Sequence, residues 1–277
     1  MREKPLKWRA LAALGRMINS SIRLPFVPMG KRRTAIAVST ILEQMNYAYE
    51  ATLPDGGSLK FFAPAYKPAF RGISLFTKQP EAPLWINSFS PEDILWDVGA
   101  NVGAYSLYAA HRGVRVLAFE PEASNYFVLT RNIALNNLWK KITPYCIALS
   151  CQTEFSMLSS FHTVIGGSKH AFGDPKDSWE ENDPVVMQQG MVAFSIDDLI
   201  SRHGLPKPNH LKVDVDGIEE KILQGAPLTL QDDELRSIHI EVQKHKPKAE
   251  KQIHDIIQAA GFRLSIEDGV NIIYRRV

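Results

Sequence analysis

The chain has 277 residues, of which 45% are hydrophobic and 22% charged, and its formal net charge is +2. This is the composition of a globular protein, long enough for one large α/β domain with an N-terminal extension. No apolar run approaches the about 18 residues of a membrane span, and the start does not resemble a secretory signal. The two cysteines, Cys146 and Cys151, predict neither a disulfide nor a metal site, so we expect a reducing, cytoplasmic location.

Residues 1–33 are strongly basic, with nine Lys and Arg residues against one Glu. Leu11, Leu14, Ile18 and Ile22 fall near helical spacing and predict an amphipathic helix. Such a helix either lies on an anionic surface at the inner face of a membrane or packs its leucines on the domain or on a partner subunit. The stripe is narrow and short, which favours packing over weak peripheral membrane contact.

A second helix is predicted over residues 34–47, followed by two short strands, 49–53 and 58–62, around a Pro-Asp-Gly-Gly turn. These elements predict an N-terminal extension, residues 1–76, that caps a main domain, residues 77–277.

The segment most informative about function runs from Asp97 to Gly103. It follows a short apolar strand and precedes a helical pattern, so it predicts a strand that ends in a glycine turn and opens a helix. Gly99 and Gly103 lack side chains and let a flat nucleoside lie against the backbone. Taken alone, the pattern also fits a tight turn without a ligand.

A second apolar strand ends at Glu120 and Pro121, and Glu120 comes 23 residues after Asp97. An acidic residue at about this spacing accepts the ribose hydroxyls of a bound nucleoside, so Glu120 is the predicted ribose anchor. Asp97 before the first glycine and Asn101 between the glycines suit the cationic end of S-adenosyl-L-methionine better than a pyrophosphate.

Beyond Glu120, helices and strands alternate as a doubly wound sheet requires. The predicted elements are helix 123–136, strands 142–148 and 210–215, helix 218–223, strand 237–242, helix 249–260 and a closing hairpin over 261–274. The weakly periodic segment 159–189, which includes His162, His170 and Trp179, is expected to be either a lid over the site or a disordered insertion.

Several of these segments resemble the FkbM family of methyltransferases in sequence and order. The resemblance runs from about Thr77 to the C-terminus and rests on residues 96–106, 119–121, 132–137, 147–150, 195–200, 211–219, 222–226 and 240–242. It implies a class I, Rossmann-like methyltransferase fold, S-adenosyl-L-methionine as cofactor and O-methylation of a sugar or similar hydroxylated acceptor. Asp216 stands where the family more often has Glu.

The predicted site combines both lines of reasoning. Asp214, Asp216 and Glu241 are the candidate catalytic residues, since they follow or close strands at the carboxyl edge of the sheet, where a base must take the acceptor's proton. Asp214 is the leading candidate for base or substrate anchor. The predicted cofactor-binding residues are Asp97, Gly99, Asn101, Gly103, Glu120, Pro121, Ala148 and Asp214. No metal is predicted, although Asp214, Asp216 and Glu219 could together bind a hard cation.

The predicted partner is a small-molecule or glycan acceptor, and no nucleic acid is expected because the chain beyond residue 33 is acidic overall. Two other readings stay open: an NAD(P)-binding oxidoreductase and a non-catalytic protein that binds S-adenosyl-L-methionine. The sequence does not indicate an oligomeric state.

Overall fold

The computed structural model describes residues 6–177 and 183–277 and divides into two compact units, Met1–Tyr47 and Ala48–Val277. The smaller unit contains α1 (Leu6–Arg23), the 3-10 turn η1 (Leu24–Met29) and α2 (Lys31–Gln44). Among the described residues, no helix combines the length and the apolar content of a membrane-spanning segment.

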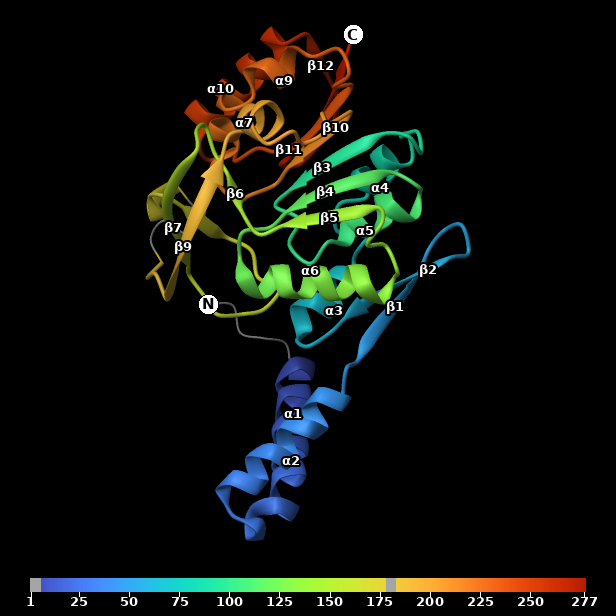
Figure 1. Ribbon diagram of the computed structural model, residues 1–277, viewed down its shortest axis with the longest axis vertical. Helices are drawn as coiled ribbons and strands as arrows, with labels where there is room; N and C mark the ends of the chain where they lie inside the picture. The colour runs from blue at the N-terminus through green and yellow to red at the C-terminus, as the bar shows by residue number, and fades with distance from the viewer. Residues whose placement is uncertain (1–5, 178–182) are drawn as a thin grey trace. The chain divides into compact units, whose positions relative to one another are not determined.

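The larger unit is built on a seven-stranded sheet (Figure 1) with the strand order β12-β13-β11-β10-β3-β4-β5. The strands are β3 (Ile94–Val98), β4 (Arg115–Phe119), β5 (Ile142–Tyr145), β10 (His210–Val213), β11 (Ser237–Glu241), β12 (Phe262–Asp268) and β13 (Asn271–Arg276). Five neighbouring strands are parallel, and β13 pairs antiparallel with both β11 and β12. The predicted α/β class I fold with a closing hairpin is confirmed.

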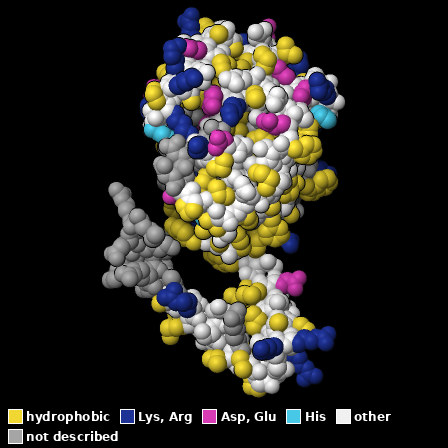
Figure 2. All heavy atoms as spheres, turned by 90° about the vertical axis from the view of Figure 1, so that its left-hand side faces the viewer, with side chains coloured by type: hydrophobic (Ala, Val, Ile, Leu, Met, Phe, Trp, Pro, Cys, Tyr) yellow, Lys and Arg dark blue, Asp and Glu magenta, His cyan; other side chains and the backbone are white. Residues whose placement is uncertain are grey.

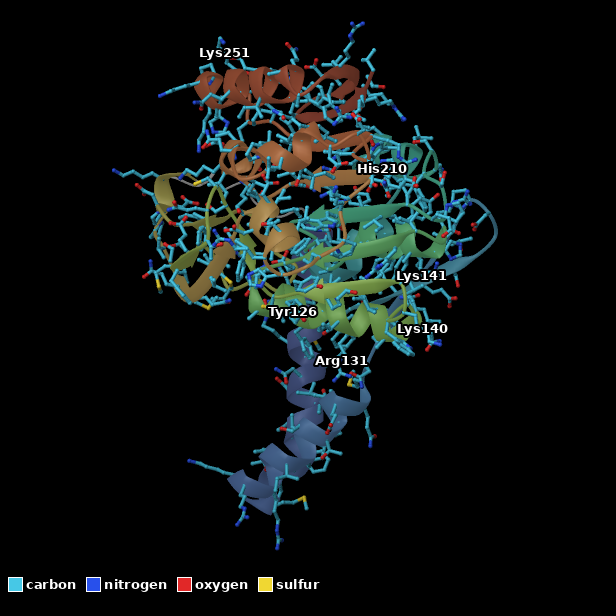
Figure 3. The ribbon with its side chains drawn as sticks, turned by 45° about the horizontal axis from the view of Figure 1, so that its top comes forward. Tyr126, Arg131, Lys140, Lys141, His210 and Lys251 are labelled. Carbon is cyan, nitrogen blue, oxygen red and sulfur yellow. The ribbon has the colours of Figure 1, made fainter. Side chains whose placement is uncertain are left out.

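Helices cover both faces of this sheet because the strands alternate their side chains between the faces. Trp96 and Val98 pack with α7 (Ile196–Ser201), α8 (Glu219–Gln224), α9 (Pro227–Gln231) and α10 (Pro247–Ala259). Leu95 faces the other way, towards α4 (Glu81–Ile86), α5 (Ala104–His111) and α6 (Ala123–Leu135). His210 lies within the sheet (Figure 3), buried between Asp93 and Ser237.

The hairpin of β1 (Ala48–Thr52) and β2 (Ser58–Phe62) belongs to this larger unit, together with α3 (Tyr66–Ile73). The backbone N–H of Phe62 donates to Asn132 of α6, and Phe61 is fully buried against the α5 and α6 side of the core. The compact units therefore divide after Tyr47 and not after residue 76, because the hairpin packs on the main domain.

A second sheet of four strands lies beside the first, in the order β6-β9-β7-β8. Its strands are β6 (Ala148–Leu149), β7 (Glu154–Ser160), β8 (His170–Phe172) and β9 (Met187–Phe194), and the short turn η2 (Pro175–Asp177) follows β8. The prediction of a single strand over residues 142–148 is wrong. The chain leaves the main sheet at the end of β5, after Tyr145, and enters the second sheet at Ala148 in β6. Segment 159–189 contributes the end of β7, all of β8 and the start of β9 to this sheet, and Trp179 lies outside the described residues.

Candidate active site

The glycine turn after β3 has the predicted geometry, but packing explains its two glycines. Gly99 and Gly103 both have positive φ angles, 80° and 83°. A Cβ on Gly99 would lie 1.9 Å from the carbonyl oxygen of Asp214, and one on Gly103 would lie 2.4 Å from Leu129 Cδ1. Glycine is required here because the loop after β10 and helix α6 approach the turn closely.

Asn101 links the turn to its surroundings. Its backbone N–H donates to Glu120 Oε2 at 2.7 Å, and its side-chain Nδ2 donates to the carbonyl of Gly167 at 2.5 Å. Asn125, at the start of α6, holds the same loop, since it donates to Gly167 and accepts from the N–H of Gly166. The loop that contains Gly166 and Gly167 is therefore fastened to the glycine turn and to α6.

A cavity of about 880 Å³, partly open to solvent, lies at the carboxyl ends of β3, β4, β10 and β11. Of the predicted cofactor-binding residues, six line it: Gly99, Asn101, Glu120, Pro121, Ala148 and Asp214. The second sheet contributes to the lining as well, with Ala148, Leu149, Leu158, His170, Ala171 and Phe172.

Glu120 lies at the β4 end of this cavity and is 4% exposed. Its carboxylate accepts from the N–H groups of Asn101 and Glu122. Burial raises the pKa of Glu120 to about 7, although these two donors act in the opposite direction. A carboxylate held in this way retains lone pairs that can accept the two hydroxyls of a ribose.

Asp97 and Gly103 are not among the described residues that line the cavity. Asp97 is 1% exposed; it accepts from Ser106 Oγ and lies 3.6 Å from Lys212 Nζ. Lys212 is its direct neighbour across the β3–β10 pair. The structure thus differs from the prediction that Asp97 faces a cationic ligand, because a buried lysine takes that place.

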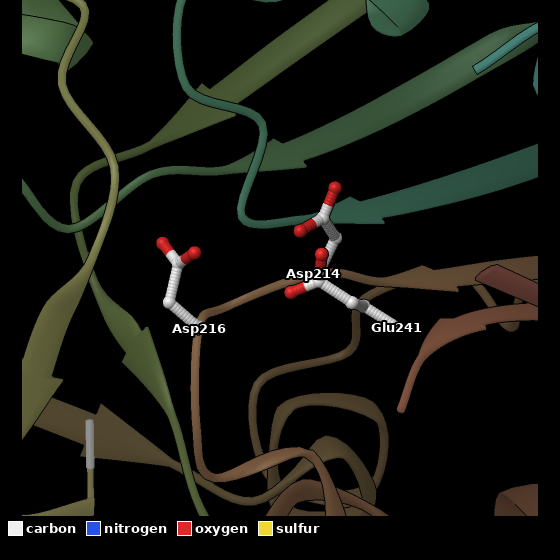
Figure 4. A group of neighbouring side chains, drawn as sticks. All are labelled: Asp214, Asp216 and Glu241. Atoms are coloured by element: carbon white, nitrogen blue, oxygen red, sulfur yellow. The ribbon is translucent and has the colours of Figure 1, made fainter. Parts of the chain in front are cut away.

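The three candidate catalytic carboxylates come together (Figure 4). Asp214 and Asp216 follow β10, Glu241 closes β11, and one oxygen from each lies within 4.8 Å of the others. Glu241 Oε2 is buried without a hydrogen-bond partner among the described residues. These are the carboxylates that could hold a cation. Glu219 instead accepts from the N–H groups of Val215 and Gly217, so it shapes the loop.

The three carboxyl groups have different protonation behaviour. Burial would raise the pKa of Asp214, but Lys212, whose Nζ lies 3.1 Å away, lowers it to about 2 with help from Lys78. Burial and the charge of Asp214 raise the pKa of Asp216 to about 6. The same causes raise the pKa of Glu241 to about 9. At neutral pH, Asp214 is ionised and Glu241 is protonated.

Sequence reasoning missed Asn125, Arg71 and Lys78, which also line the cavity. Asn125 follows the Glu-Pro segment closely, and its place in the first turn of a predicted helix was the available signal. Arg71 and Lys78 lie in the region before β3, where no motif marks them.

The sequence model of the methyltransferase FkbM domain matches residues 97–264, more than half of the chain. The chain belongs to the FkbM methyltransferase family. The matched region covers the glycine turn, Glu120 and the carboxylate cluster. The predicted family and its cofactor, S-adenosyl-L-methionine, are confirmed, although the match is shorter than the predicted resemblance from Thr77 onwards.

Two curated relatives of this chain are distant in sequence. The hexuronic acid methyltransferase AglP of Haloferax volcanii is 27% identical over 179 residues, which cover 64% of this chain and 67% of that protein. The 31-O-demethyl-FK506 methyltransferase FkbM of Streptomyces tacrolimicus is 24% identical over 155 residues, 49% of this chain and 60% of the relative. The chain thus spans about three fifths to two thirds of these relatives.

A crystal structure of methyltransferase FkbM from Methylobacillus flagellatus is similar with a TM-score of 0.49 and 17% identity, and the alignment covers 76% of this chain and 53% of that one.

The residues of the cavity suit the cofactor. Glu120 would supply an acceptor for ribose hydroxyls, the apolar residues Ile147, Ala148 and Leu149 would offer a surface for an adenine ring, and Asp214 would supply a negative charge near the glycine turn.

Proposed function

We propose that this protein transfers a methyl group from S-adenosyl-L-methionine to a hydroxyl of a sugar or a similar small hydroxylated acceptor. The observation that carries the proposal is the placement of Glu120 and of the carboxylate cluster at different ends of one cavity. The first can hold a nucleoside and the second can accept a proton. Similarity to a hexuronic acid methyltransferase supports a sugar as acceptor.

The bound cofactor would supply an electrophilic methyl group on a sulfonium. The bond from this methyl to sulfur breaks as its bond to the acceptor oxygen forms, the electron pair stays on sulfur, and the hydroxyl proton passes to a base. The protein aligns the acceptor and excludes water. We propose that Glu120 accepts from the ribose and that segment 159–189 closes the site as a lid, since His170 and Phe172 line its wall.

Asp216 is the proposed base. A carboxylate with a pKa of about 6 is ionised at neutral pH and is more basic than Asp214, whose pKa is about 2. Glu241, with a pKa of about 9, is protonated at neutral pH and can donate a hydrogen bond to the acceptor. Asp214 would then orient the acceptor or the cofactor and not take the proton. No metal is part of this proposal.

The test combines binding with turnover. We expect isothermal titration calorimetry to show binding of S-adenosylhomocysteine and no binding of NAD. Mass spectrometry should detect methyl transfer to a member of a panel of hexoses, hexuronic acids and polyketide alcohols. Binding without turnover on the whole panel favours the non-catalytic alternative, and turnover that is lost after exhaustive EDTA treatment contradicts the metal-free version.

We further propose that the smaller unit contacts an anionic membrane surface, as the basic sequence of residues 1–33 allows. Apolar side chains of this unit are exposed, and they lie beside Lys and Arg side chains (Figure 2). Among the described side chains of this unit, the exposed large hydrophobic ones are Leu14, Met17, Ile18, Leu24, Val27, Met29, Ile36, Leu42, Met45 and Tyr47. A surface of this kind can insert apolar groups while its cations meet acidic headgroups.

Liposome flotation tests this contact. The full chain should float with vesicles that contain phosphatidylglycerol and should remain below with pure phosphatidylcholine vesicles. Residues 48–277 alone form a compact unit and serve as the comparison. Equal flotation of both proteins would remove the proposal.

A further inference from the structure

Two cations lie at the glycine-turn end of the cavity. Arg71 in α3 and Lys78 before α4 line the cavity beside Asp214. Within residues 6–177 and 183–277, neither side chain makes a hydrogen bond or an ion pair. Burial, and then the charge of Arg71, lowers the pKa of Lys78 more than the charges of Asp214 and Glu241 raise it.

A smaller recess extends from the same end of the cavity. Its walls are formed by Arg71, Ser74, Leu75, Lys78, the turn Gly99–Val102, Ala104, Tyr105, Lys212 and Asp214. The recess shares both cations with the main cavity. Among the described residues, it includes neither Glu120 nor Glu241 and no residue of the second sheet. The two cations therefore belong to the glycine-turn side of the site.

The strand order fixes the direction in which a nucleoside would extend. Glu120 follows β4, the glycine turn follows β3, and Asp214 follows β10, and these three strands are neighbours in that order. If the ribose is held at Glu120 and the sulfur lies over the turn, the rest of the molecule reaches the recess. In S-adenosyl-L-methionine, that part is an amino acid with one ammonium and one carboxylate.

We propose that Arg71 and Lys78 bind the carboxylate of the methionine part of S-adenosyl-L-methionine, while Asp214 faces its ammonium. This inference rests on the proposed function, because it assumes that the cofactor lies with its ribose at Glu120. A guanidinium matches a carboxylate with two parallel hydrogen bonds, and an ammonium adds a further charge-assisted bond.

An acidic acceptor is the other anion that these cations could meet. The lining of the recess argues against an acidic acceptor. Among the described residues, this lining includes neither Asp216, the proposed base, nor Glu241, nor any residue of the second sheet. The carboxylate of the donor therefore fits the position of Arg71 and Lys78 better than the acceptor does.

The test compares two ligands that differ in one group. Isothermal titration calorimetry on the full chain measures the affinity for S-adenosyl-L-methionine and for its decarboxylated form. The wild-type protein should prefer the carboxylated ligand by about tenfold or more, since a hydrogen bond to a charged group contributes that much. Arg71→Gln and Lys78→Gln should each reduce this preference, and Arg71→Lys should retain part of it.

Two exposed cations serve as controls. Arg263, on β12, and Lys60, on β2, lie outside the cavity, so Arg263→Gln and Lys60→Gln should keep the wild-type preference. Thermal unfolding of every variant shows that it is folded. Because each result is a ratio of two affinities for the same variant, a uniform loss of binding-competent protein does not change it.

The inference is overturned if the wild type binds both ligands equally, or if Arg71→Gln and Lys78→Gln both keep the wild-type ratio. If the variants keep the wild-type ratio of the two affinities but have a raised KM for the acceptor, the cations bind the acceptor, and the inference is again overturned. A wild-type protein that binds neither nucleoside would refute the proposed function as well, so the two failures are distinguishable.

Discussion

Lys212 gives the sharpest prediction about stability, because it is a fully buried cation between two carboxylates. Its side chain is 2% exposed, and its Nζ lies 3.1 Å from Asp214 Oδ2 and 3.6 Å from Asp97 Oδ1. With an effective dielectric constant of about 20, each attraction is about 5 kcal/mol before the ions' desolvation is subtracted. Removing one partner of a buried ion pair costs about 3–5 kcal/mol, and we expect this loss for Lys212→Met.

The loss should depend on pH. In the wild type, the folded-state pKa of Asp214, about 2, is below the about 3.9 of an unfolded Asp, so this group adds stability above pH 4 that is lost as the pH falls towards 2. Without Lys212, burial dominates and the folded-state pKa rises above the unfolded value. Stability of the variant then falls as the pH rises, so its deficit should be larger at pH 8 than at pH 5.

Urea unfolding followed by circular dichroism at pH 5 and pH 8 measures both effects. Lys207→Met is the matched control, because Lys207 pairs with Asp232 at the exposed surface and its loss should matter far less. Adding Asp97→Asn to Lys212→Met should restore part of the stability. The reasoning is refuted if Lys212→Met is as stable as Lys207→Met at pH 8, or if its deficit is the same at both pH values.

Three further predictions concern the site. Gly99→Ala should destabilise the protein by at least about 2 kcal/mol in thermal unfolding, because Gly99 has a positive φ and the added Cβ would meet the Asp214 carbonyl. Gly190→Ala is the control and should change little, since no atom lies within 4 Å of its added Cβ. Equal melting temperatures of the two variants would contradict this prediction. The affinity for S-adenosylhomocysteine in calorimetry should rise with pH and level off above about pH 7, because Glu120 ionises in this range. The Glu120→Gln variant should bind about tenfold more weakly, and its affinity should not depend on pH in this way. A steep pH dependence in the variant would show that Glu120 is not the source of the effect. In a pH profile of kcat, activity should fall below about pH 6 as Asp216 becomes protonated. The Asp216→Asn variant should lower kcat by about 100-fold or more and should lose this acidic fall in activity. If the fall is unchanged in the variant, another group is responsible for it.

The sequence signals for the predicted cofactor side of the site are local. The turn after β3 needs glycines at positive φ, and the strand that ends at Glu120 is a short apolar run next to a helix breaker. Both features lie within about 25 residues of each other. Their geometry follows from backbone conformation, and the structure agrees with it.

The second sheet was not predicted, because its strands pair over long separations. Ala148 pairs with Ala193, and Glu154 pairs with the same residue from the other side. The apolar pattern of such short strands is weak, and their partners are chosen by packing. The predicted strand 142–148 ran through the point where the chain changes sheets for the same reason.

The sequence by itself determined the family, the order of the main elements and the positions of Glu120 and of the two aspartates after β10. Only the tertiary structure decided which charges meet. Asp97 faces Lys212 because β3 and β10 are neighbours in the sheet, and Glu241 joins Asp214 because β11 lies beside β10. Electrostatic roles depend on distance and burial, and these are set by the packing of segments far apart in the chain.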